Sequence, residues 1–121
     1  MTTDPPISTF KAQLNAAGPA CQLVLAGSAE ASDVEALERA LAEFHAVAQE
    51  HGARDVEIDF RALEFITSAC LKPLVAWLSR ARDLPAGKEY RIHFLSNFKH
   101  LWQKRSLQAL SCFASDLVVI D

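Results

Sequence analysis

A hydroxyl and a thiol lie close together where an apolar strand pattern gives way to an apolar helix pattern. The stretch is "FITSACLKP", in which Thr67 and Ser68 precede Cys70. A serine at the start of a helix has two common uses. Its oxygen caps a backbone N–H, or it accepts a phosphate, which the helix dipole and the free N–H groups favour. A serine or cysteine in such a place is also a candidate nucleophile.

The nucleophile hypothesis has the least support from the neighbouring residues. The segment lacks the Gly-x-Ser-x-Gly turn that exposes a catalytic serine. No histidine is close to it in sequence, although His93 on the neighbouring strand could approach. Cys70 belongs to the first turn of a helix, where a thiol pKa is lowered if the thiol is exposed, but buried, inert cysteines are more common. We therefore expect no enzymatic activity and name no catalytic residue. Two uses remain open: Thr67 or Ser68 as the helix cap, and Ser68 as a phosphorylation site.

The helix that follows Ser68 is indicated by apolar residues at positions i, i+3, i+4 and i+7. These residues are Leu71, Leu74, Val75 and Leu78. Lys72 stands one turn after Ser68 and would supply a counter-charge to a phosphate. Pro73 lacks an N–H for the Ala69 carbonyl, so we expect it to bend or delay this helix.

Strand and helix patterns alternate along the rest of the chain. Short apolar or alternating runs predict strands, and 3.6-residue periodicity predicts helices. The expected strands are residues 8–14, 21–27, 55–60, 89–95 and 117–121, and the expected helices are residues 28–52, the segment after Ser68, and part of 96–113. The two strands at the beginning are expected to pair as a hairpin.

The clearest helix is the segment 28–52. Ser32 followed by Glu35 predicts a capping box, and Gly52 predicts the end of the helix. Strands that alternate with helices of this length call for right-handed crossovers and a largely parallel sheet. We predict an α/β sandwich with a small mixed, mostly parallel sheet of four to five strands and three to four helices.

Composition narrows the class of protein. The 121 residues, half of them hydrophobic and 22% charged, fit a single domain, residues 1–121, with residues 1–8 expected to be loosely ordered. No apolar run approaches the roughly 20 residues needed to span a bilayer, and no signal peptide is visible, so we expect a cytoplasmic protein without membrane insertion. The three widely spaced cysteines indicate reduced thiols. Neither cysteines nor histidines show metal-ligand spacing, so no metal or cofactor is expected.

Charge is distributed unevenly. Residues 1–60 carry 3 Lys/Arg against 10 Asp/Glu, whereas residues 61–121 carry 9 against 5. Because the net charge of −3 is not basic, this asymmetry favours a protein partner over nucleic acid. Four basic side chains surround Trp102, and two interpretations are open: a contact for an acidic partner or phosphate, or a solvated helix face. They are Lys99, His100, Lys104 and Arg105.

Three short stretches follow one another in the chain: the strand "VEIDF", the pair "FI" and the following "TSACL". Together with the order of elements from about residue 20 to the end, they resemble the STAS domain of anti-anti-sigma factors (anti-sigma factor antagonists). In that family the strand usually ends in Asp, and an apolar pair leads into Asp-Ser-Ser/Thr-Gly-Leu at the start of the second helix. On this pattern Asp59 matches the strand Asp, Thr67 the motif Asp, Ser68 the phosphorylated Ser, Ala69 the second hydroxyl residue, Cys70 the Gly and Leu71 the Leu.

The tail "WQKRSLQAL", which runs from Trp102 to Leu110, is similar to that of small bacterial STAS-like regulators. Their tail has a Trp-Gln-x-x-Ser-Leu-x-x-Leu pattern. Trp102 and Leu110 are expected to make core contacts from a helix whichever family applies.

The resemblance implies a non-catalytic switch in transcription regulation, with protein partners. The expected partners are a GHKL-type serine kinase that also acts as an anti-sigma factor, which binds the unphosphorylated form, and a PP2C-type phosphatase that resets it. Phosphorylation is expected at Ser68. The partner-binding residues are expected to be Asp59, Thr67, Ser68, Ala69, Cys70 and Lys72.

The residues "TSA" leave a second interpretation of the function open. A STAS subunit that is not phosphorylated and docks on a larger assembly, such as a lipid ABC transporter, often has Thr and Ala in place of the serine. A homodimer is also possible on this sequence.

Overall fold

The computed structural model describes residues 9–17, 20–97 and 99–120. Residues 1–8, for which loose order was expected, lie outside this part of the chain. The elements in chain order are β1 (Lys11–Ala17), β2 (Ala20–Ala29), a 3₁₀ turn (Ala31–Asp33), α1 (Val34–Glu50), β3 (Asp55–Ile66), α2 (Ser68–Arg82), β4 (Arg91–Leu95), α3 (Leu101–Ser111), a second 3₁₀ turn (Cys112–Ala114) and β5 (Val118–Ile120).

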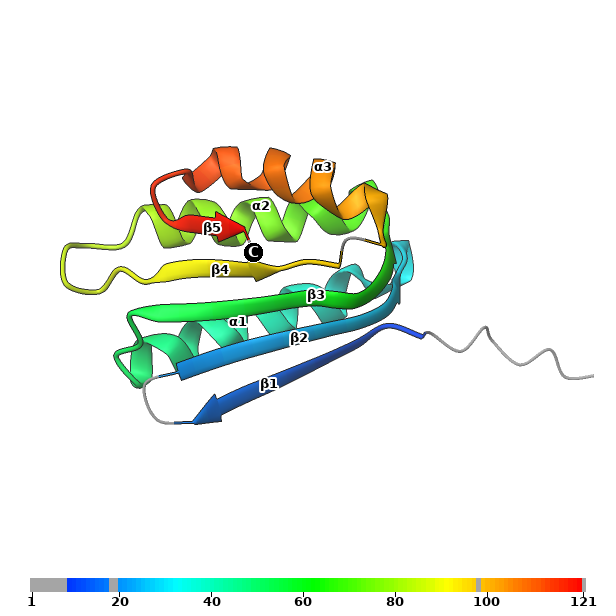
Figure 1. Ribbon diagram of the computed structural model, residues 1–121. Helices are drawn as coiled ribbons and strands as arrows, with labels where there is room; N and C mark the ends of the chain where they lie inside the picture. The colour runs from blue at the N-terminus through cyan, green and yellow to red at the C-terminus, as the bar shows by residue number, and fades with distance from the viewer. Residues whose placement is uncertain (1–8, 18–19, 98, 121) are drawn as a thin grey trace, which may run out of the picture.

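The five strands form one sheet in the order β1-β2-β3-β4-β5 (Figure 1). The strands β1 and β2 pair antiparallel as the expected hairpin, and the pairs from β2 to β5 are parallel. Helices connect the parallel strands because parallel neighbours need long crossovers. The predicted α/β class with a mixed, mostly parallel sheet is confirmed.

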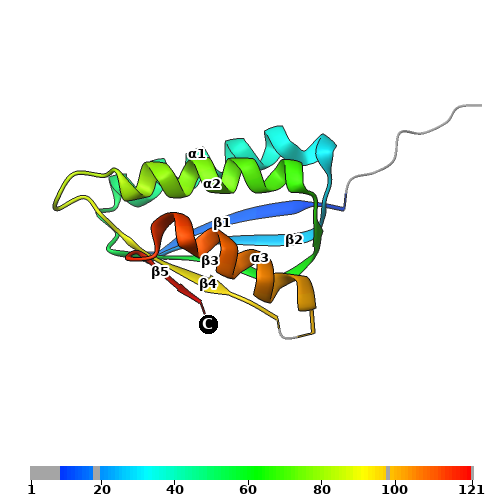
Figure 2. The ribbon, with the colours of Figure 1, turned by 90° about the horizontal axis from the view of Figure 1, so that it is seen from above.

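Both α1 and α2 cover one face of the sheet, and α3 lies along its β4–β5 side (Figure 2). Alternate strand residues point to the helices and form the core. In the register of the sheet Leu23 lies beside Ile58, and Ile58 beside Phe94, and all three are buried. The burial of these apolar side chains drives the packing of the helices on the sheet.

The predicted cap of α1 is wrong. The capping box falls on Glu30 and Asp33, and the Glu30 N–H donates to Asp33 Oδ2 at 2.8 Å. A 3₁₀ turn separates β2 from α1, so the capping box forms around this turn and begins at Glu30, two residues before the expected Ser32. Gly52 has φ +61° directly after the helix, as the predicted stop requires.

The strand β3 continues to Ile66, six residues beyond its predicted end. Its pairing with β2 contains irregularities, at Val24/Ala26 and at Gly27/Ser28. Its pairing with β4 ends at Asp59, which lies beside Leu95. The last part of β3 therefore lacks β4 as a neighbour and curves upward to reach α2 (Figure 1).

Pro73 does not delay α2. The helix begins at Ser68 and includes Pro73, which is buried. Within this helix the buried face consists of Cys70, Pro73, Leu74, Trp77, Leu78 and Ala81. Leu71 and Val75, which were expected in the core, are only partly buried against it.

Candidate functional site

A single residue, Thr67, separates β3 from α2. Its backbone N–H donates to the carbonyl of Ala29 at 3.0 Å, and the thiol of Cys70 donates to the carbonyl of Glu30 at 3.2 Å. Ala29 is the last residue of β2, and Glu30 follows it directly. These two contacts fix the start of α2 against the neighbouring strand, so the junction is held in one geometry.

The cap position belongs to Thr67, which has extended backbone angles (φ −79°, ψ 159°). Its hydroxyl makes no capping hydrogen bond, and Thr67 Oγ1 is buried without a partner among the described residues. Ser68 is the first residue of the helix and is exposed. The serine hydroxyl is therefore not used as the N-cap, and it is open to solvent.

The electrostatic surroundings of Ser68 favour an anion. The first turn of α2 contains no acidic residue, and the first N–H groups of a helix have no intrahelical acceptor. They form the positive end of the helix dipole. Lys72 follows at position i+4 and is exposed, so its ammonium can reach the same side of the helix.

Asp59 lies apart from this junction. Its side chain accepts hydrogen bonds from Arg61 Nε (2.9 Å), Arg61 Nη2 (2.8 Å) and the Arg61 backbone N–H (2.9 Å). These bonds hold the pKa of Asp59 below its usual value, although burial acts in the opposite direction. Because Asp59 is only 7% exposed, its carboxylate mainly orders β3 where the pairing with β4 ends.

The other predicted site residues are contiguous but differ in exposure. Ser68 and Lys72 are exposed, Thr67 and Ala69 are half-buried, and Cys70 is fully buried. Ser68 and Lys72 therefore offer the accessible polar groups, and Cys70 contributes through its bond to Glu30, the residue after β2. Partner binding by this set stays a prediction.

The nucleophile hypothesis gains nothing from the geometry. His93 Nε2 lies 3.1 Å from Asp55 Oδ1, near the start of β3, whereas Ser68 follows the other end of that strand. Within the described ranges, no group of three His, Cys, Asp or Glu side chains is arranged to hold a metal ion.

Sequence reasoning missed Gln103. Its side chain is fully buried, and Nε2 donates to the carbonyls of Phe60 (2.7 Å) and Leu63 (2.9 Å) while Oε1 accepts the backbone N–H of Asn97 (2.9 Å). The adjacent Trp102 donates from Nε1 to the carbonyl of Glu64 at 2.8 Å. A signal was present, because Gln103 occupies the helical face of Leu107 and Leu110, where a core side chain is expected.

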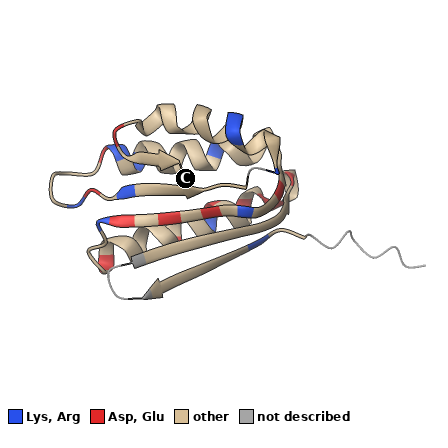
Figure 3. Ribbon diagram, viewed as in Figure 1, with Lys and Arg blue, Asp and Glu red and all other residues tan. Residues whose placement is uncertain are grey.

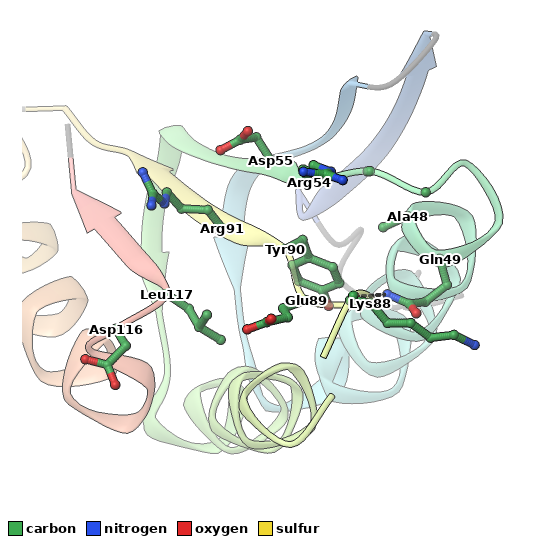
Figure 4. A pocket seen from close by; sticks show the side chains of 13 residues that line it. Ala48, Gln49, Arg54, Asp55, Lys88, Glu89, Tyr90, Arg91, Asp116 and Leu117 are labelled. Atoms are coloured by element: carbon green, nitrogen blue, oxygen red, sulfur yellow. Dashed lines mark hydrogen bonds between the residues drawn. The ribbon is translucent and has the colours of Figure 1, made fainter. Parts of the chain in front are cut away.

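A hollow of about 790 Å³ lies at the end of β3 opposite to Ser68 (Figure 4). Its lining includes Arg54, Asp55, Tyr90, Arg91 and Asp116. In Figure 4 the charged side chains of Arg54, Arg91 and Asp116 point in different directions. They do not converge on one point, so we assign no ligand to this hollow.

No protein-family model matches this sequence, and no curated protein matches it at a significant level. Among solved structures, the chain is similar to a crystal structure of an anti-sigma factor antagonist from Mycobacterium paratuberculosis. The TM-score is 0.63 at 17% sequence identity, over 88% of this chain and 86% of that chain. The fold is therefore STAS-like.

The STAS-like fold agrees with the arrangement that the resemblance implied. Ser68 occupies the start of the second helix, directly after the long strand β3. Among the helices of the described part of the chain, none combines the length and apolar character needed to cross a bilayer.

Proposed function

We propose that this protein is a non-catalytic regulatory binding module, similar to an anti-sigma factor antagonist, whose partner binding is switched off by phosphorylation of Ser68. The observation that carries the proposal is that Ser68 is exposed as the first residue of α2, at a helix start without an acidic residue. The STAS-like fold shared with an anti-sigma factor antagonist supports it.

A phosphate at this position would change the docking surface without unfolding it. It adds about −1.5 to −2 charges at pH 7, and the helix N-terminus and Lys72 would stabilise that charge within the protein. A partner that packs on the uncharged hydroxyl would have to desolvate the phosphate, or would meet it with its own acidic groups. One covalent event therefore turns binding off.

The partners in this proposal are a GHKL-type serine kinase that doubles as an anti-sigma factor, and a PP2C-type phosphatase, both in the cytoplasm. Exposed Ser68 and Lys72 and half-buried Thr67 and Ala69 would form the contact surface. Cys70 would support that surface from within through Glu30, and Asp59 would act at a distance by ordering β3 through Arg61.

Affinity capture from the native cells with wild type, Ser68→Ala and Ser68→Asp tests the switch. We expect a partner that the Ala form retains and the Asp form loses. Ser115→Asp is the matched control, since Ser115 is exposed and precedes Asp116 of the hollow at the other end of β3. Equal capture by all three Ser68 forms would rule out the switch and would fit a subunit that docks without phosphorylation.

Phosphate-affinity electrophoresis of the protein from its own cells tests the modification itself. We expect a retarded band that Ser68→Ala abolishes. A retarded band that persists in Ser68→Ala would place the modification on another residue.

A further inference from the structure

The segment that contains α3 carries only one sign of charge. The sequence has no Asp or Glu between Glu89 and Asp116, while Lys99, Lys104 and Arg105 lie within that interval. Figure 3 shows basic but no acidic positions on α3, in contrast to the acidic positions along β3. The three cations are exposed, and none forms a salt bridge with another residue that the structure describes.

An exposed apolar side chain lies among these cations. Leu101, the first residue of α3, is 84% exposed. Lys104 and Arg105 follow it at positions i+3 and i+4, which share its face of the helix. Binding of a partner that covers this exposed leucine lowers the free energy, because apolar surface is removed from water. The cations around it favour an acidic partner.

This face is continuous with the Ser68 site. Trp102 is bonded to the carbonyl of Glu64, which stands four residues before Ser68. At about 3.3 Å per residue the chain between them spans at most about 13 Å, and Phe65 between them is 49% exposed. A standard interface covers about 800 Å² on each partner, or about 30 Å across. One partner can therefore contact Ser68 and Leu101 together.

We propose that the start of α3 is a second docking surface for the partner of the Ser68 site, and that it binds an acidic segment bearing an apolar side chain. The joint use of the two surfaces rests on the proposed function. The chemistry of the α3 surface does not, because it follows from Leu101 and its three neighbouring cations. Opposite charge would speed and orient docking, and Leu101 would enter an apolar contact.

A defined probe tests the surface without a known partner. ¹⁵N-labelled protein is titrated at about 0.15 M salt with a synthetic peptide of acidic residues and leucines, and with a counterpart that has lysines in place of the acids. We expect the acidic peptide to shift the amide signals of residues 99–105 and 64–69, and the basic peptide to leave them unchanged. Shifts confined to other elements, or no binding of the acidic peptide, would overturn the proposal.

Matched variants sharpen the result. Lys104→Glu with Arg105→Glu should weaken the acidic peptide at least about tenfold, and Leu101→Ser several-fold at unchanged charge. Lys88→Glu is the control, because Lys88 is exposed beside the hollow at the other end of β3. Equal affinity of wild type and the double charge reversal would sink the proposal. Tighter binding of a DNA or RNA duplex than of the acidic peptide would replace it with a nucleic-acid surface.

Failure of the two proposals can be told apart. If the acidic peptide shifts the signals of α3 but Ser68→Asp captures the same partners as wild type, the switch is contradicted and the α3 surface is supported. If partner binding responds to Ser68→Asp but not to the charge reversal on α3, the second surface falls and the switch stands.

Discussion

Gln103 on α3 donates a 2.7 Å hydrogen bond to the carbonyl of Phe60 on β3. The same amide group also bonds Leu63 and Asn97, and it is fully shielded from water. This part of β3 lies beyond the last residue that pairs with β4. The helix α3 thus supplies, through one side chain, hydrogen bonds that the neighbouring strand does not. Ser68 follows five residues after Leu63, so we infer that this support helps to position it.

Replacing Gln103 with Leu should destabilise the protein by about 3 kcal/mol. The substitution leaves two buried carbonyls and one buried N–H without partners, and each such group costs about 1–3 kcal/mol, partly offset by the apolar gain. Urea unfolding followed by circular dichroism measures the change.

Gln108→Leu is the control for that measurement, since Gln108 lies on the same helix and is exposed. We expect its effect to stay within about 0.5 kcal/mol. Equal effects of the two substitutions would contradict the supporting role of the buried amide.

Ser68→Asp should leave the free energy of unfolding unchanged or raise it by about 0.5 kcal/mol. A carboxylate in the first turn of α2 interacts favourably with the helix dipole, and the exposed side chain has no packing to lose. Urea unfolding of Ser68→Asp and Ser68→Ala checks this. A loss of more than about 1 kcal/mol would mean that lost partner binding by the Asp form reflects misfolding.

Gly27→Ala should destabilise the protein by more than about 2 kcal/mol. Gly27 has φ +82° within β2, and an added Cβ would collide with the carbonyl of Thr9. A non-glycine residue also costs about 1–2 kcal/mol in this backbone region. Gly87→Ala separates the two causes, because Gly87 has φ +91° with no atom near its added Cβ. If both variants lose the same stability, the collision has no effect.

The protein should lose stability as the pH falls through about 6.5, in part because of His45. His45 Nδ1 lies 2.6 Å from the Tyr90 hydroxyl. Burial, and to a lesser extent the charge of Arg80, lower the pKa of His45. The unfolded chain therefore takes up the proton first, and stability drops between the unfolded pKa and the lower folded pKa.

Unfolding free energies of wild type and His45→Gln between pH 5 and pH 8 test this sign. The other histidines are common to both proteins, so the difference in slope isolates His45. We expect the variant to show a weaker fall toward acid pH. Identical slopes would exclude a contribution from His45.

Local patterns were enough for the order of the elements and for the place of Ser68. Alternation of apolar and polar residues depends on neighbours along the chain, so the hairpin, the parallel strands and the helix after Ser68 could be predicted. The stop at Gly52 follows equally from one residue's backbone freedom.

Features that depend on residues far apart in the chain could not be predicted from local patterns. The capping box moved to Glu30 and Asp33 because a 3₁₀ turn intervenes between β2 and α1. The strand β3 extends to Ile66 because β2 pairs with it as far as Ala29, across register shifts that no local pattern reveals.

The same distinction between local and distant residues applies to the candidate site. The sequence by itself placed a serine at a strand-to-helix junction, because strand and helix periods meet there. Only the tertiary structure decided that Ser68 is exposed, that Cys70 and Asp59 are buried, and that Gln103 supports the approach to Ser68. The physical reason is that these side-chain hydrogen bonds connect residues about 40 positions apart. Which distant residues meet, and which side chains are buried, depends on how the helices and strands pack together.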